Sequence, residues 1–232
     1  MPRESKANKQ KRAIKICNIL DRRYPDAKCA LDHTDPFTLT IAVMLSAQTT
    51  DAQVNKVTPT LFSKWPTCYD MASADLIDVQ DTIRSLGFYK NKAKHCIGCA
   101  QMVVSDYNGQ VPKTMKELVR LPGVGRKTAN IVLNVGYGIV DGIAVDTHVY
   151  RIASRLKLTN APTPAKAEID LLNVIPEELW GPVNHNWILF GREICDARQP
   201  QCDICPLQEL CPSAFKPVET KKEHQRKLQK KK

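Results

Sequence analysis

The sequence contains no apolar run that approaches the roughly 18–20 residues needed to span a membrane. No hydrophobic region follows the basic residues at its start, as a secretory signal would require. Alternation of apolar and polar residues is weak throughout, and no internal repeat is visible. These absences argue against membrane, secreted and β-sheet proteins, and we expect an intracellular, cytoplasmic protein.

Lysine and arginine outnumber the acidic residues by 34 to 24, and the excess lies at the two ends. Residues 1–12 hold five basic residues and one acidic residue, and residues 213–232 hold eight and two. Residues 13–212 hold 21 of each sign and are neutral overall. The ends are either solubilising tails or polybasic arms that follow a phosphate backbone, and composition does not choose between these roles. Beyond Pro217 we expect disorder.

Glycine and proline punctuate a pattern of apolar residues that is helical almost everywhere. A first helix is expected over about residues 8–22. The segment DPFTLTIAVMLSAQ has Asp35 as a candidate N-cap and is interpreted as a buried helix. Gly87 and the pair Asn108–Gly109 are expected to end helices. The pattern predicts an all-α protein of about ten helices.

Nine cysteines, an odd number, argue against a disulfide framework in a chain without a signal peptide. Four of them fall in one proline-containing loop that is poor in apolar residues: Cys195, Cys202, Cys205 and Cys211. Four thiolates so close together predict a metal site that organises the loop in place of a core. Zinc and a [4Fe–4S] cluster both accept four cysteines, and the spacing does not choose between them. Cys96 and Cys99, three residues apart in a helical pattern, are expected in the core.

The stretch LPGVGRKTAN places two glycines in a tight turn between two expected helices. Gly123, Val124 and Gly125 would present backbone N–H groups at a helix start, where they suit a phosphate. Lys127 follows, although a helix N-terminus already carries partial positive charge. The helix terminus, Arg126 and partial burial would lower the pKa of this lysine and favour an amine nucleophile.

Asp146, in IAVDTHVYR, ends an apolar segment and starts the next expected helix. Taken alone, it is an ordinary N-cap. With Lys127, 19 residues earlier, it forms a candidate amine–carboxylate pair in which each group stands at a helix N-terminus.

LPGVGRKTAN, IAVDTHVYR, LSAQTTD and the cysteine spacing together resemble the endonuclease III family, DNA glycosylase/AP lyases of the helix–hairpin–helix superfamily. The resemblance covers roughly residues 8–213. It implies a six-helix domain over 29–139 and a discontinuous domain, 13–28 plus 140–212, that carries a [4Fe–4S] cluster on the four cysteines. Residues 1–12 and 213–232 would be basic tails.

The resemblance also implies an activity and a set of site residues. A damaged pyrimidine such as thymine glycol is flipped out of double-stranded DNA, and Lys127 attacks C1′ to form a Schiff base. β-Elimination then cuts the strand 3′ to the abasic site, with Asp146 assisting proton transfers and stabilising charge. Gln48 matches the residue that fills the hole left by the base, and Phe88 falls where the family often has a leucine wedge. The hairpin residues Gly123, Val124, Gly125 and Arg126 would contact the DNA backbone of this monomeric enzyme.

The sequence departs from the family in one respect. Its cluster loop, residues 196–210, has one basic residue, Arg198, where the family commonly has several. The loop therefore offers fewer cations to the DNA backbone than the loops of the family.

Two alternatives stand beside this interpretation. The related adenine glycosylase typically lacks the lysine, carries an extra C-terminal domain, and has a glutamate where this chain has Ala42. A non-catalytic DNA-binding module with zinc in the loop would be colourless, whereas an iron–sulfur protein is yellow-brown.

Overall fold

The computed structural model describes residues 4–214, and all its regular secondary structure is helical. The C-terminal segment for which disorder is expected lies outside the described residues. The α-helices are α1 (Lys6–Arg23), α2 (Pro36–Leu45), α3 (Asp51–Lys64), α4 (Cys68–Ala72), α5 (Leu76–Thr82), α6 (Tyr89–Tyr107), α7 (Met115–Leu118), α8 (Arg126–Ile131), α9 (Thr147–Arg155), α10 (Pro164–Leu172) and α11 (Trp180–Glu193). The all-α prediction is confirmed. None of these helices is long and apolar enough to cross a membrane.

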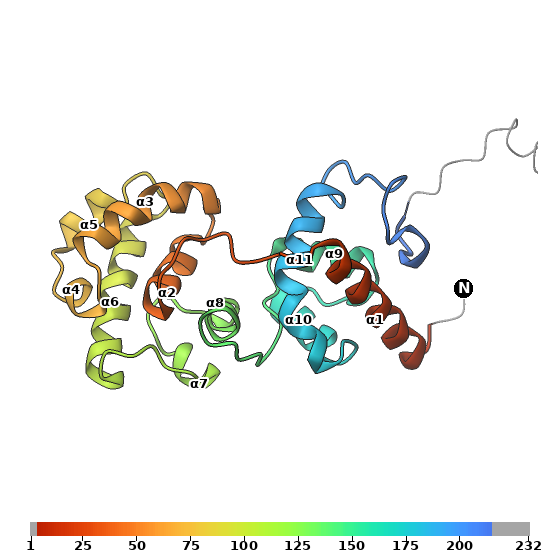
Figure 1. Ribbon diagram of the computed structural model, residues 1–232, viewed down its shortest axis with the longest axis horizontal. Helices are drawn as coiled ribbons and strands as arrows, with labels where there is room; N and C mark the ends of the chain where they lie inside the picture. Colours follow the sequence, from red (N-terminus) through yellow and green to blue (C-terminus); the bar gives the residue numbers. More distant parts are fainter. Residues whose placement is uncertain (1–3, 215–232) are drawn as a thin grey trace, which may run out of the picture.

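Two groups of helices lie side by side and are joined by extended connections (Figure 1). We call α2–α8 the hairpin lobe, because it contains the turn between α7 and α8. We call α1, α9–α11 and the following loop the cluster lobe. Each lobe has its own hydrophobic core, and the core of the cluster lobe combines α1 with residues from Ile143 onward. The hairpin between α7 and α8 therefore belongs to one lobe and the four-cysteine loop to the other.

The hairpin lobe is built around α2, in which Phe37 to Leu45 are all buried. Asp35 caps this helix by accepting hydrogen bonds from the N–H groups of Phe37 and Thr38, as predicted. Residues 29–139 contain seven α-helices, α2 to α8, where the resemblance implied six. A π-helical turn over Val132–Gly136 continues α8.

The prediction that residues 1–12 form a basic tail is wrong for most of that segment. Helix α1 begins at Lys6, so most of these residues are helical. Arg12 Nη1 donates to the carbonyl oxygens of Leu156 at 2.6 Å and Leu210 at 3.2 Å. These bonds hold the start of α1 against the rest of the cluster lobe.

Helix ends follow the predictions in part. Asn108 (φ 52°) and Gly109 (φ 77°) end α6 as expected. Gly87 ends no helix, because α5 has already stopped at Thr82 and Ile83 is its C-cap. Cys96 and Cys99 are fully buried in the core, as predicted, and burial raises the pKa of both thiols.

Candidate active site and cluster loop

The hairpin before α8 is packed closely against its own lobe. Gly123 has φ +79°, and a Cβ at this position would overlap Met44 and lie 2.9 Å from His95 Cβ. Both the backbone conformation and the lack of space therefore require glycine. Gly125, by contrast, has open space around it and caps α8 without a side-chain hydrogen bond. The first amide groups of α8 thus have no side-chain partner at an exposed turn.

Val124 and Arg126 both make contacts within the protein. The Val124 side chain is buried, and its N–H donates to the Leu121 carbonyl within the turn at 3.0 Å. Arg126 Nε donates to Glu168 Oε2 at 2.8 Å, and Asn130 Nδ2 donates to Glu168 Oε1 at 2.9 Å. Glu168 lies on α10, so this buried carboxylate joins the two lobes. The Arg126 side chain is 48% exposed, which leaves its other N–H groups accessible.

Lys127 and Asp146 come from different lobes and line the same two hollows, of about 90 and about 670 Å³. Lys127 lies in the first turn of α8 and is exposed, not partly buried as predicted, because it borders the two hollows and not the core. Asp146 is half-buried and caps α9, its Oδ1 accepting the Val149 N–H at 2.8 Å. None of the ion pairs within residues 4–214 includes Lys127. The predicted amine and carboxylate therefore face one space.

Three lining residues were not singled out from the sequence. Arg192 Nη2 pairs with Asp51 Oδ2 at 2.9 Å, which forms a second ion pair between the lobes at the rim of both hollows. His185 lines the smaller hollow, and burial lowers its pKa, so its imidazole is neutral at pH 7. No spacing in the sequence signals these residues, because only the folded chain brings α11 to α3, where Arg192 meets Asp51, and so to the lysine.

Gln48 and Phe88 are both non-glycine residues in the left-handed region, with φ 54° and 58°. Gln48 is exposed and lines the larger hollow with Lys127. Phe88 caps α6 and is 66% exposed, but it lines neither hollow. Ala42, the position of the alternative glutamate, is fully buried and lines neither hollow.

The four cysteines of the C-terminal loop line a cavity of about 260 Å³. Arg155, on α9, organises the loop by donating to the carbonyls of Asp196 at 2.6 Å and Ala197 at 2.8 Å. Its Nη1 also lies 3.3 Å from Cys195 Sγ. The loop is therefore folded around the thiols, with an arginine on one side.

Comparison with known proteins agrees with this geometry. Residues 41–177 match the HhH-GPD superfamily of base excision DNA repair proteins, and residues 195–211 match the iron–sulfur binding domain of endonuclease III. The chain is 46% identical to endonuclease III of Synechocystis sp. over 208 residues, which cover 90% of this chain and 95% of that protein. The chain belongs to the endonuclease III family. It is a bifunctional DNA glycosylase/AP lyase of base excision repair.

Other members of the endonuclease III family are similarly close over their full length. Endonuclease III of Escherichia coli K12 is 39% identical, with 88% of this chain and 96% of that protein covered. A solved structure of a non-covalent endonuclease III–DNA complex has a TM-score of 0.83 at 42% identity, covering 94% of this chain and 98% of that chain. A trapped endonuclease III–DNA covalent intermediate also has a TM-score of 0.83, at 44% identity, covering 88% of this chain and 96% of that one.

Membership of the endonuclease III family implies a [4Fe–4S] cluster in the loop between Cys195 and Cys211. The donor set fits a cluster better than one ion. Among residues 4–214, no three His, Cys, Asp or Glu side chains are grouped closely enough to hold a single metal ion, whereas four thiols surround one cavity. Burial and the neighbouring thiols raise the pKa of Cys205 and Cys211, so bound iron would be what holds them as thiolates.

Proposed function

We propose that this endonuclease III removes oxidised pyrimidines, such as thymine glycol, from double-stranded DNA and cleaves the strand 3′ to the resulting abasic site. The proposal is carried by one observation: Lys127 and Asp146 reach the same hollow from opposite lobes. Because C1′ of a stacked nucleotide cannot be reached inside a duplex, the damaged nucleotide is flipped into this space.

The chemistry uses Lys127 as a neutral amine. Its nitrogen attacks C1′, and the base leaves with the glycosidic electron pair and takes a proton from the attacking nitrogen. The C1′–O4′ bond then breaks as O4′ accepts a proton, which opens the sugar ring and gives a protonated Schiff base. Removal of a proton from C2′ then expels the 3′ phosphate by β-elimination. No carboxylate pairs with Lys127 in residues 4–214, so its amine is not engaged by an ion pair.

Asp146 is the group proposed to move protons and to stabilise positive charge on the sugar. Its Oδ1 is engaged by the Val149 N–H, which fixes the carboxylate at the N-terminus of α9. No hydrogen bond within residues 4–214 uses Oδ2, which leaves that oxygen for the substrate.

A set of DNA-contacting residues belongs to the same proposal. We assign the backbone amides of Gly123 and Gly125 and the free N–H groups of Arg126 to phosphates. Val124 supports the turn through its buried side chain. Gln48 fills the hole left by the flipped base, and the exposed ring of Phe88 stacks on a neighbouring base.

Four further assignments complete the proposal. Cys195, Cys202, Cys205 and Cys211 hold the [4Fe–4S] cluster, and the enzyme acts as a monomer. Its partner is double-stranded DNA that contains damaged bases or abasic sites. An enzyme with this substrate works where the DNA is, so we propose an intracellular, nucleoid-associated location.

Borohydride trapping on a duplex with one thymine glycol tests the mechanism. Wild type should give a covalent protein–DNA adduct, and Lys127→Ala should give none. Lys116→Ala, which removes another exposed lysine on the neighbouring α7, is the matched control and should give the wild-type amount. Release of the base without any adduct from wild type would instead indicate a monofunctional glycosylase. An intact base would indicate a binding protein.

A further inference from the structure

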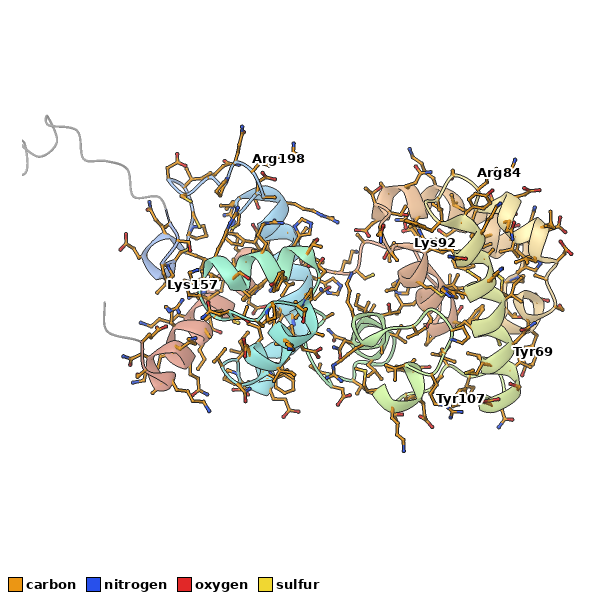
Figure 2. All side chains as sticks on the ribbon, turned by 180° about the vertical axis from the view of Figure 1, so that it is seen from behind. Tyr69, Arg84, Lys92, Tyr107, Lys157 and Arg198 are labelled. Carbon is orange, nitrogen blue, oxygen red and sulfur yellow. The ribbon has the colours of Figure 1, made fainter. Side chains whose placement is uncertain are left out.

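Lys92 occupies an unusual place for a lysine. It is the only buried lysine among residues 4–214, with 5% of its surface exposed. It also lies near the start of α6, where the helix dipole disfavours a cation. In Figure 2 it lies within the lobe, whereas the nearby Arg84 lies at the outer surface. No ion pair within the described residues includes Lys92, and burial lowers its pKa. Burying a charged group without an ion-pair partner costs free energy, so we expect this lysine to supply a particular interaction.

The ammonium of Lys92 makes one hydrogen bond, to a residue next to Gln48. Its Nζ donates to Thr49 Oγ1 at 2.8 Å. The Thr49 hydroxyl in turn donates to the Ala47 carbonyl at 3.5 Å, and the Thr49 N–H donates to the Ser46 carbonyl at 3.0 Å. Residues 46–50 are thereby folded into a turn with Gln48 at its exposed tip.

Lys92 also contacts the turn that carries Phe88. Its backbone N–H donates to the Phe88 carbonyl at 3.1 Å as part of α6, so the lysine side chain extends to Thr49 from the helix start that Phe88 caps. A second bond, from Gln53 Nε2 to Ser85 Oγ at 3.1 Å, joins the same two segments. Left-handed conformations of non-glycine residues persist only where their surroundings fix them, and here two such residues stand on segments that one lysine connects.

We propose that Lys92 is a positioning residue that holds Gln48 and Phe88 in a fixed relation at the DNA surface. The inference rests on the proposed function, in which these two side chains act on the duplex around the flipped nucleotide. Lys92 itself is buried and touches no DNA. Its contribution should therefore appear only where a base must be extruded from a duplex.

Lys92→Met tests this role, because methionine keeps an apolar side chain of similar length and removes the ammonium. Single-turnover excision of thymine glycol from a duplex should fall about 10-fold or more, the scale expected when a binding group is misplaced. β-Elimination at an abasic site in a single strand, which needs no extrusion, should stay close to wild type. Thr49→Val should reproduce the duplex defect, and Thr49→Ser, which keeps the hydroxyl, should not.

Three results would overturn the proposal: equal losses on duplex and single strand, an unchanged duplex rate, or full additivity of Lys92→Met with Gln48→Ala. If Lys92→Met does not fold, which thermal melting reveals, the comparison of Thr49→Val with Thr49→Ser decides. A wild-type enzyme without lyase activity on either substrate would contradict the proposed function instead.

Discussion

Gly123 shows how one residue links the hairpin to the stability of its lobe. Replacement by alanine forces a side chain into a left-handed conformation and against Met44 and His95. We expect Gly123→Ala to lower the free energy of unfolding by about 1–3 kcal/mol in urea titrations. Gly125→Ala, in open space at φ −89°, should change it by less than about 0.5 kcal/mol. Equal losses would show that the backbone conformation is not what selects glycine at 123.

The buried position of Lys92 leads to a second prediction, on how stability depends on pH. Burial lowers its pKa in the folded protein below the ordinary 10.5, so between the two values the unfolded chain binds more protons. Stability should therefore rise with pH through this window. Lys92→Met lacks this group, and the stability of wild type relative to the variant should increase toward pH 10.5. Parallel pH profiles from urea unfolding of the two proteins would contradict the prediction.

Among the elements, α8 and α10 depend on Glu168 for their contact. Removing this buried carboxylate leaves the Asn130 amide and the Arg126 guanidinium without their partner. Glu168→Ala should lower the free energy of unfolding by about 1–3 kcal/mol, and Glu168→Gln by less. Glu177→Ala, which alters an exposed acidic residue outside this contact, is the control and should have little effect. A loss no larger than that of the control would show that the contact between α8 and α10 does not need the carboxylate.

The cluster loop is an element whose fold we expect to depend on its cofactor. Cys205→Ser should abolish the visible absorption of the purified protein and expose residues 196–214 to proteases, because the loop contains little apolar material of its own. Cys29→Ala, which alters a half-buried cysteine far from the loop in sequence, should keep the absorption. Retention of both colour and protection in Cys205→Ser would remove this cysteine from the ligand set.

For the whole molecule, a prediction concerns how the net charge of +10 contributes to DNA binding. Deleting residues 213–232 removes eight basic and two acidic residues. If the segment follows the phosphate backbone, the slope of log affinity against log salt should flatten by about 0.9 for each phosphate that the segment neutralises. An unchanged slope, measured by fluorescence anisotropy on an undamaged duplex, would leave the segment a solubilising role.

Local chemistry in the sequence was enough to predict much of this protein. The apolar period predicted an all-α fold, and the Asp35 and Asp146 caps were confirmed, because a cap depends on residues two or three positions away. The spacing of the cysteines predicted a metal site for a similar reason, since the donors lie in one short loop. The resemblance carried by the motifs then chose the iron–sulfur cluster, which the family match supports.

The packing of the lobes decided the rest. The resemblance gave Arg126 a contact with the DNA backbone, and nothing in the sequence showed that it also pairs with Glu168, 42 residues away on the other lobe. Lys127 is exposed rather than partly buried. Asp51 and Arg192 meet at the rim of the hollows although 141 residues separate them. Burial, ion pairing and backbone strain depend on which surfaces of the folded chain meet. The spacing of residues along the chain does not reveal those contacts. Only the tertiary structure could therefore place the buried Lys92 beside the turn that carries Gln48.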